Sequence, residues 1–277
     1  MTVQSVPFLS IFGMALTLII SLGLPVYLFI RWRKTLEVRI SSLIFGAVIY
    51  YVAAKVLEPM VNASILSNVG GAMMNNMFIY AVYVGLIAVV IEELCRYFTL
   101  KSIIRNVDEH NALFFGLGFC GLEAILTAAW PQVSNILNSV LINNGLMAQS
   151  LALLQEPELS STYFAIAPLW ETPSVAFLLA GFERGLIMVL HICLSLLLFY
   201  FIKSGDKKYL AVALIAHFAV VACSALLTQM DIAIVSVAIT AAVSGALVVF
   251  THRSHKEYEA QRPMGEYAVI EQAKPLE

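Results

Sequence analysis

The sequence predicts an all-α membrane protein, a polytopic bundle of about seven transmembrane helices. Of its 277 residues, 60% are hydrophobic and only 12% are charged. Soluble domains carry about 25% charged residues, so a chain this apolar is expected to lie in a bilayer. The apolar residues also gather in long runs, and a helix needs roughly 20 of them in succession to cross a membrane. The composition and the runs together exclude an ordinary soluble domain.

The individual spans follow from the apolar runs along the chain. Each run approaches or exceeds the length of roughly 20 residues that a bilayer requires. The runs cover residues 7–30, 40–60, 77–98, 111–130, 174–202, 209–228 and 231–251. A very short turn joins the last two, so we expect them to form a hairpin. Residues 1–251 are therefore predicted to form one transmembrane helical domain.

The charges of the connecting segments predict the orientation. Lys and Arg occur after the first, third and fifth spans and in the C-terminal tail. The opposite loops carry no Lys or Arg, and their charged residues are Glu58, Glu156, Glu158, Glu171 and Asp231. Cytoplasmic loops are the ones enriched in Lys and Arg. We therefore expect the N-terminus outside and the C-terminus in the cytoplasm.

Two segments are expected to differ from the spans. Residues 131–173 form the longest outer loop, and their apolar first part predicts an interfacial or re-entrant helix. Residues 252–277 are polar and predict a flexible cytoplasmic tail. The four cysteines lie inside apolar runs without zinc-binding spacing, which favours free thiols. A net charge of −2 gives no reason to expect a nucleic-acid partner.

Ionisable side chains inside spans are costly and are functional candidates for that reason. At about 1.5 Å per residue, His217 lies roughly 12 Å, His191 roughly 15 Å and Glu123 roughly 18 Å from the cytoplasmic edge. Glu92 and Glu93 lie roughly 8–10 Å deep on the same scale. Four helices thus bring imidazoles and carboxylates to one layer in the cytoplasmic half of the bilayer.

The remaining intramembrane charges have structural interpretations. Lys55 and Glu58 lie toward the outer face and are not expected to join this layer. Glu183 and Arg184 are neighbours in sequence and are expected to form a packing ion pair. Glu123 has no cation within one helical turn in sequence, so its partner must come from another helix.

Two histidines and a carboxylate on different helices suit a zinc site. His191 and His217 are the candidate imidazole ligands, with Glu93 or Glu123 as the carboxylate ligand. The other glutamate of the pair Glu92–Glu93 would then act as general base. Each histidine taken alone is equally well explained as a hydrogen-bonded contact between helices. Their common depth is what favours a site.

Arg96 follows Glu92 by four residues and Glu93 by three, so either carboxylate can pair with it. Such a pair would keep one carboxylate ionised and oriented, and Arg96 would also be placed to stabilise an oxyanion. The structural alternative is an ion pair at a helix end, with Arg96 reaching the interface. The segment 116–124 is rich in small residues and predicts close helix approach, which would bring Glu123 to a shared site.

Four motifs, in this order, resemble the YhfC family of intramembrane metalloproteases, which is similar to the CAAX-protease/bacteriocin-processing and PrsW groups. The motifs are IEELCR (91–96), GLGFCGLEAIL (116–126), FERGLIMVLHICLS (182–195) and YLAVALIAHF (209–218). The resemblance spans residues 10–250. It implies a helical zinc endopeptidase of the bacterial cytoplasmic membrane.

The resemblance also implies roles for individual residues. The family's glutamate pair corresponds to Glu92 and Glu93, and its metal-binding histidines to His191 and His217. Family members often carry a histidine where this chain has Phe119. If that histidine is a ligand in relatives, Glu123 or one of the glutamate pair must replace it here.

The leading hypothesis is an intramembrane zinc peptidase with Glu92, Glu93 and Arg96 as its catalytic residues. Its substrate would be a membrane-embedded or membrane-proximal peptide that arrives from the cytoplasmic half. A binding protein or an ion- or proton-coupled transporter could use the same polar layer instead. A structural partner subunit is a third class, in which Glu93 and His217 would be dispensable.

Overall fold

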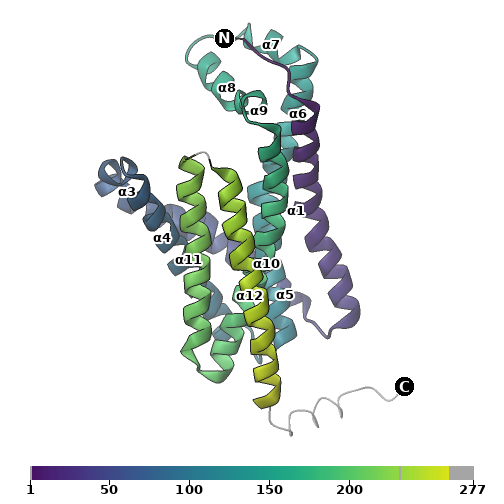
Figure 1. Ribbon diagram of the computed structural model, residues 1–277, viewed down its shortest axis with the longest axis vertical. Helices are drawn as coiled ribbons and strands as arrows, with labels where there is room; N and C mark the ends of the chain where they lie inside the picture. Colours follow the sequence, from purple (N-terminus) through teal and green to yellow (C-terminus); the bar gives the residue numbers. More distant parts are fainter. Residues whose placement is uncertain (1, 231, 262–277) are drawn as a thin grey trace.

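The protein is a bundle of long helices, and its computed structural model describes residues 2–230 and 232–261 (Figure 1). No strand occurs in this part of the chain. Seven helices in it are long and apolar enough to cross a membrane. The predicted all-α fold with about seven spans is therefore confirmed.

Four spans are regular α-helices that begin close to the predicted first residues. They are α1 (Phe8–Thr35), α10 (Ser174–Ser204), α11 (Lys207–Gln229) and α12 (Ala233–Gln261). The other three spans are each built from consecutive segments. The second joins α2 (Ile40–Tyr50), η1 (Tyr51–Leu57) and α3 (Glu58–Met74); the third joins α4 (Met77–Phe98) and η2 (Thr99–Ile103); the fourth joins α5 (Glu109–Ala124), η3 (Ile125–Ala129) and α6 (Trp130–Asn143).

The segments η1, η2 and η3 are π-helical, with one more residue per hydrogen-bonded turn than an α-helix. Such insertions rotate the residues that follow them relative to those before. Helical π segments are frequent at functional sites. Here η1 and η3 both border the cavity described below.

The segment predicted as the outer loop, residues 131–173, is helical over most of its length. Its apolar first part, expected as an interfacial or re-entrant helix, instead continues the fourth span as α6. Three short helices follow: α7 (Leu146–Leu151), α8 (Glu158–Ile166) and α9 (Pro168–Glu171). They form a cap with its own apolar core, in which Ile142 and Trp170 pack with Met14 of α1. This packing joins the end of α6 and the helix α9 to the start of α1.

The last helix is also longer than predicted, because α12 continues through Gln261 and makes residues 252–261 helical. His255 contacts Glu109 of α5 at 2.7 Å, and Glu257 accepts a hydrogen bond from Lys208 at 2.8 Å. The remainder of the predicted tail, 262–277, lies outside the described residues. So does Asp231, which contributed to the predicted loop charge.

Helix α5 occupies the centre of the bundle, between α2 and α10. A Cβ on Gly118 would collide with the backbone carbonyl of Leu43 in α2, and one on Gly46 with that of Phe115 in α5. On its other side, a Cβ on Gly116 would lie 3.0 Å from Ser195 of α10. The close approach predicted for the small residues of 116–124 is thus confirmed.

The bundle has two distinct ends (Figure 1). The cap end carries the N-terminus and helices α7–α9, and α11 ends and α12 begins on the side of the bundle that faces it. The opposite end carries the turn between α10 and α11 and the C-terminal end of α12. We call it the basic end because Lys203, Lys207 and Lys208 flank that turn. Helices α1, α4, α10 and α12 run from the cap end toward the basic end, and α2, α5 and α11 run the opposite way.

Candidate metal centre

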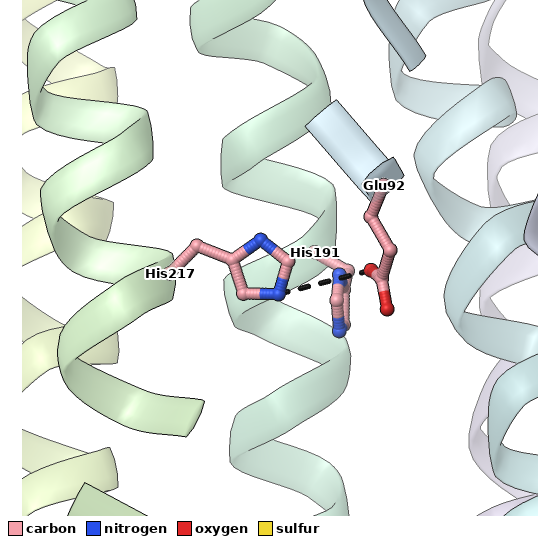
Figure 2. A group of neighbouring side chains, drawn as sticks. All are labelled: Glu92, His191 and His217. Atoms are coloured by element: carbon pink, nitrogen blue, oxygen red, sulfur yellow. Dashed lines mark ion pairs between the residues drawn. The ribbon is translucent and has the colours of Figure 1, made fainter. Parts of the chain in front are cut away.

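Glu92 of α4, His191 of α10 and His217 of α11 converge inside the bundle (Figure 2). Each offers one possible ligand atom, and these atoms lie within 4.8 Å of one another. The exposed fractions of the three residues are 8%, 4% and 1%. Since the third span continues through η2 to Ile103, Glu92 lies roughly 16 Å from that end, deeper than predicted.

His217 is oriented by Glu93. Its Nδ1 lies 2.8 Å from Glu93 Oε1, and a carboxylate can only accept, so Nδ1 carries the proton. The other ring nitrogen, Nε2, therefore has its lone pair free and lies 3.7 Å from Glu92 Oε2. A carboxylate that holds one nitrogen of a histidine while the other faces a metal is a recurrent arrangement in metal sites.

His191 has partners at both ring nitrogens. Arg96 Nη2 lies 3.1 Å from Nδ1, and a guanidinium only donates, so Nδ1 carries the lone pair. Nε2 then carries the proton and lies 3.0 Å from Glu123 Oε2. His191 could therefore bind a metal ion only through Nε2 after that nitrogen has lost its proton, whereas Nε2 of His217 has a free lone pair.

Arg96 is completely buried and compensates the charge of this cluster. Its guanidinium lies 3.1 Å from Glu93 and 3.9 Å from Glu92. Its central carbon also lies 4.1 Å from the ring centroid of Phe119, a cation–π contact. Phe119 in turn lies 5.3 Å from the His191 ring, so it forms a wall of the cluster and offers no ligand atom.

The cation that pairs with Glu123 comes from α10. This agrees with the sequence, in which no cation lies within one helical turn of Glu123. Arg184 Nη1 lies 2.8 Å from Glu123 Oε1. The predicted pairing of Arg184 with Glu183 is wrong, because neighbouring residues on a helix point in directions about 100° apart. Glu183 instead accepts hydrogen bonds from Ser236 and Thr240 of α12, at 3.2 and 3.4 Å.

A cavity of about 410 Å³ lies against the cluster. Glu92, Glu123, His191 and His217 line it. Glu93 and Arg96 are not among its lining residues. Of the glutamate pair, Glu92 is therefore the member that a molecule in the cavity can reach.

Lys55 and Glu58 also line this cavity, so the prediction that they lie apart from the polar layer is wrong. Glu58 thus lines the same cavity as Glu92. The prediction assumed that the second span crosses the membrane as a regular helix, whereas η1 inserts a π-helical segment just before Glu58. The sequence signal for Glu58 was a carboxylate inside the neighbouring span. Its depth, counted along a regular helix, separated it from the other polar residues.

The donor atoms fit a zinc ion. Ligand atoms around tetrahedral zinc lie about 3.4 Å apart, given bonds of roughly 2.0–2.1 Å. The 3.7 Å between His217 Nε2 and Glu92 Oε2 is close to this spacing. Glu92 Oε2 is also buried without a hydrogen-bond partner among the described residues. Two imidazole nitrogens and a carboxylate oxygen are the donor set of many catalytic zinc sites.

These features define a multi-pass helical membrane protein with a buried imidazole–carboxylate cluster suited to a metal ion. Comparison with known proteins narrows the class. Residues 20–243 match the family described as YhfC intramembrane metalloprotease, and the chain belongs to that family. All the cluster residues lie inside the matched range.

A curated relative supports the same assignment. The chain is 30% identical over 208 residues to the "Uncharacterized membrane protein YhfC" of Bacillus subtilis (strain 168). The alignment covers 74% of this chain and 80% of the relative. No solved structure matches the chain.

Proposed function

We propose that this protein is an intramembrane zinc endopeptidase of the bacterial cytoplasmic membrane. The observation that carries the proposal is the convergence of Glu92, His191 and His217 beside a cavity, with the Nε2 lone pair of His217 directed at Glu92. The family description as a metalloprotease supports the same chemistry. The substrate would be a peptide segment in or near the membrane.

The ligands proposed from this geometry are His191, His217 and Glu92. The sequence left Glu93 or Glu123 as the carboxylate ligand, but neither belongs to the group whose ligand atoms all lie within 4.8 Å of one another, and Glu93 orients His217 instead. A zinc ion held by the three residues would supply Lewis acidity, which lowers the pKa of water and polarises a peptide carbonyl.

The remaining residues of the cluster position these ligands. Glu93 holds the tautomer of His217, and Glu123 Oε2 lies 3.0 Å from Nε2 of His191. Arg96 balances the negative charge of the glutamates. It is fully buried and does not line the cavity, so it does not contact the substrate. We therefore assign Glu93 and Arg96 positioning roles.

The proton acceptor must line the cavity, since it has to reach the water that attacks the peptide bond. Glu58 and Glu123 are the carboxylates that satisfy this condition besides Glu92. Glu123 is already paired with Arg184 through its Oε1 at 2.8 Å. Glu58 forms no such ion pair with a described Lys or Arg, and it is the proposed acceptor for that reason.

The test is zinc content and peptide cleavage by purified protein, compared between two histidine variants. His217→Ala is expected to lose zinc, measured by elemental analysis, and to lose cleavage of membrane peptides, measured by mass spectrometry. His252→Ala changes an exposed histidine of α12 outside the cluster and should retain both. Absence of metal from the parent protein, or full metal in His217→Ala, would refute the zinc assignment. Ion or proton flux without hydrolysis would favour transport instead.

A further inference from the structure

The cavity lies on one side of the cluster only. On α11, which runs toward the cap end, the lining residues Val220, Val221, Ser224 and Ala225 all follow His217. On α4, which runs the opposite way, Val84 and Ala88 precede Glu92. Both helices therefore place the cavity between the cluster and the cap end.

The other walls agree with this direction. On α10, Ile187 lies one turn before His191, again toward the cap end. On the fourth span, Thr127 of η3 lies one turn after Glu123 and is exposed. Lys55, also exposed, borders the cavity from η1. The exposed members of the lining mark its mouth.

The opposite side of the cluster is closed. One helical turn toward the basic end, the four helices carry Arg96, Phe119, Ser195 and Ala213. The exposed fraction of each of these residues is 0%. Fully buried and closely packed side chains on all four helices leave no opening for a peptide on this side. A molecule can therefore approach the cluster from the cap end and not from the basic end.

We propose that the peptide substrate reaches this site from the cap end, which the loop charges predict to be the non-cytoplasmic side. This inference rests on the proposed peptidase function. It replaces the expected approach from the cytoplasmic half. The substrate class is then a membrane protein segment presented at the non-cytoplasmic surface, rather than a cytoplasmic or prenylated C-terminus.

The chemistry of the mouth supports a peptide as the occupant. Val84, Val221 and Ala225 form an apolar wall, whereas Lys55 and Thr127 are polar. An extended segment can contact both kinds of wall through its side chains and its backbone groups. Lys55 is the one Lys or Arg among the described residues that line the cavity, and no carboxylate of the described residues lies within 4 Å of its amine. It is placed to bind an acidic group of the segment.

The test measures access by labelling of single cysteines in oriented membranes. The half-buried thiols Cys95 and Cys223 are first replaced by alanine, and this parent should stay unlabelled. Thr127→Cys and Ser224→Cys place thiols at the cavity, and Lys207→Cys places an exposed thiol at the basic end as control. A membrane-impermeant maleimide is applied to spheroplasts and to inverted vesicles.

The expected result is that both cavity cysteines react in spheroplasts, whereas the control reacts in inverted vesicles. Reaction of the cavity cysteines from the same side as the control would overturn the proposal. So would their reaction in inverted vesicles alone. Using two cavity positions protects the result against a single variant that does not fold.

Labelling needs no catalysis, so failure of access and failure of the peptidase function are distinguishable. In an active protein, a bulky adduct at Thr127→Cys should reduce cleavage at least tenfold, whereas the same adduct at Lys207→Cys should leave it unchanged. Labelling from the cap end without any cleavage would refute the peptidase function alone. Full cleavage despite the Thr127→Cys adduct would refute the proposed route alone.

Discussion

Replacing Glu93 with glutamine is expected to weaken zinc binding without abolishing it. In the structure Glu93 accepts the Nδ1–H of His217 at 2.8 Å and pairs with Arg96 at 3.1 Å. A glutamine oxygen can still accept the proton of Nδ1, so the tautomer of His217 survives, but the negative charge is lost. Loss of such an orienting partner typically costs 10–100-fold in metal affinity. At about 1.4 kcal/mol per tenfold change, this amounts to roughly 1.4–2.8 kcal/mol.

The matched variant is Glu92→Gln, which changes the neighbouring residue of the same pair. Its charged oxygen is a proposed ligand, so its loss should cost more than the 100-fold upper limit for an orienting residue. Both affinities are measured by titrating purified protein against a competing chelator at one pH. If Glu93→Gln lost zinc completely while Glu92→Gln bound it normally, Glu93 would be the ligand and the assignment argued above would be wrong.

Three further predictions concern the walls of the site. Gly118→Ala should lower the thermal midpoint of unfolding, because the added Cβ meets the backbone of α2 and overpacking costs about 1–3 kcal/mol. Gly121→Ala is the control, since a Cβ at Gly121 has only ordinary van der Waals contacts, and equal shifts in the two variants would contradict this prediction. Lys55→Met should raise KM for peptides with an acidic residue and leave zinc content unchanged; an unchanged KM would remove its role in binding. Phe119→Leu should destabilise the fold by about 0.5–2 kcal/mol through loss of the cation–π contact with Arg96, measured by thermal unfolding. An unaltered midpoint in that variant would show that the ring contributes no net stability there.

Much of the architecture could be predicted from the sequence because hydrophobic length is a local property. Each span has to be apolar over its own length, whatever its neighbours are. The family motifs also identified the polar residues that converge, and the structure places Glu92, His191 and His217 together. Their convergence was inferred from common depth, which sequence spacing measures approximately.

Other features could not be predicted because they depend on contacts between helices. Glu58 joins the cavity although counting along a regular helix placed it elsewhere. Arg184 selects Glu123 over its sequence neighbour because side-chain direction, not proximity along the chain, decides which charges meet. The apolar segment after Ala129 extends the fourth span because Met14 and Trp170 bury part of it.

Residue types and their spacing along the chain are enough to predict a bundle of about seven membrane-spanning helices with imidazoles and carboxylates at similar depth. Contacts between helices select the carboxylate that faces the cavity, the carboxylates that lie against the histidines, and the end from which the cluster can be reached. Those outcomes depend on the rotation and tilt of helices in close contact, as at Gly118 between α5 and α2 and at Gly85 between α4 and α11. A rotation of about 100° separates Glu92 from Glu93 on α4, and no local pattern specifies which of the two turns toward the cavity.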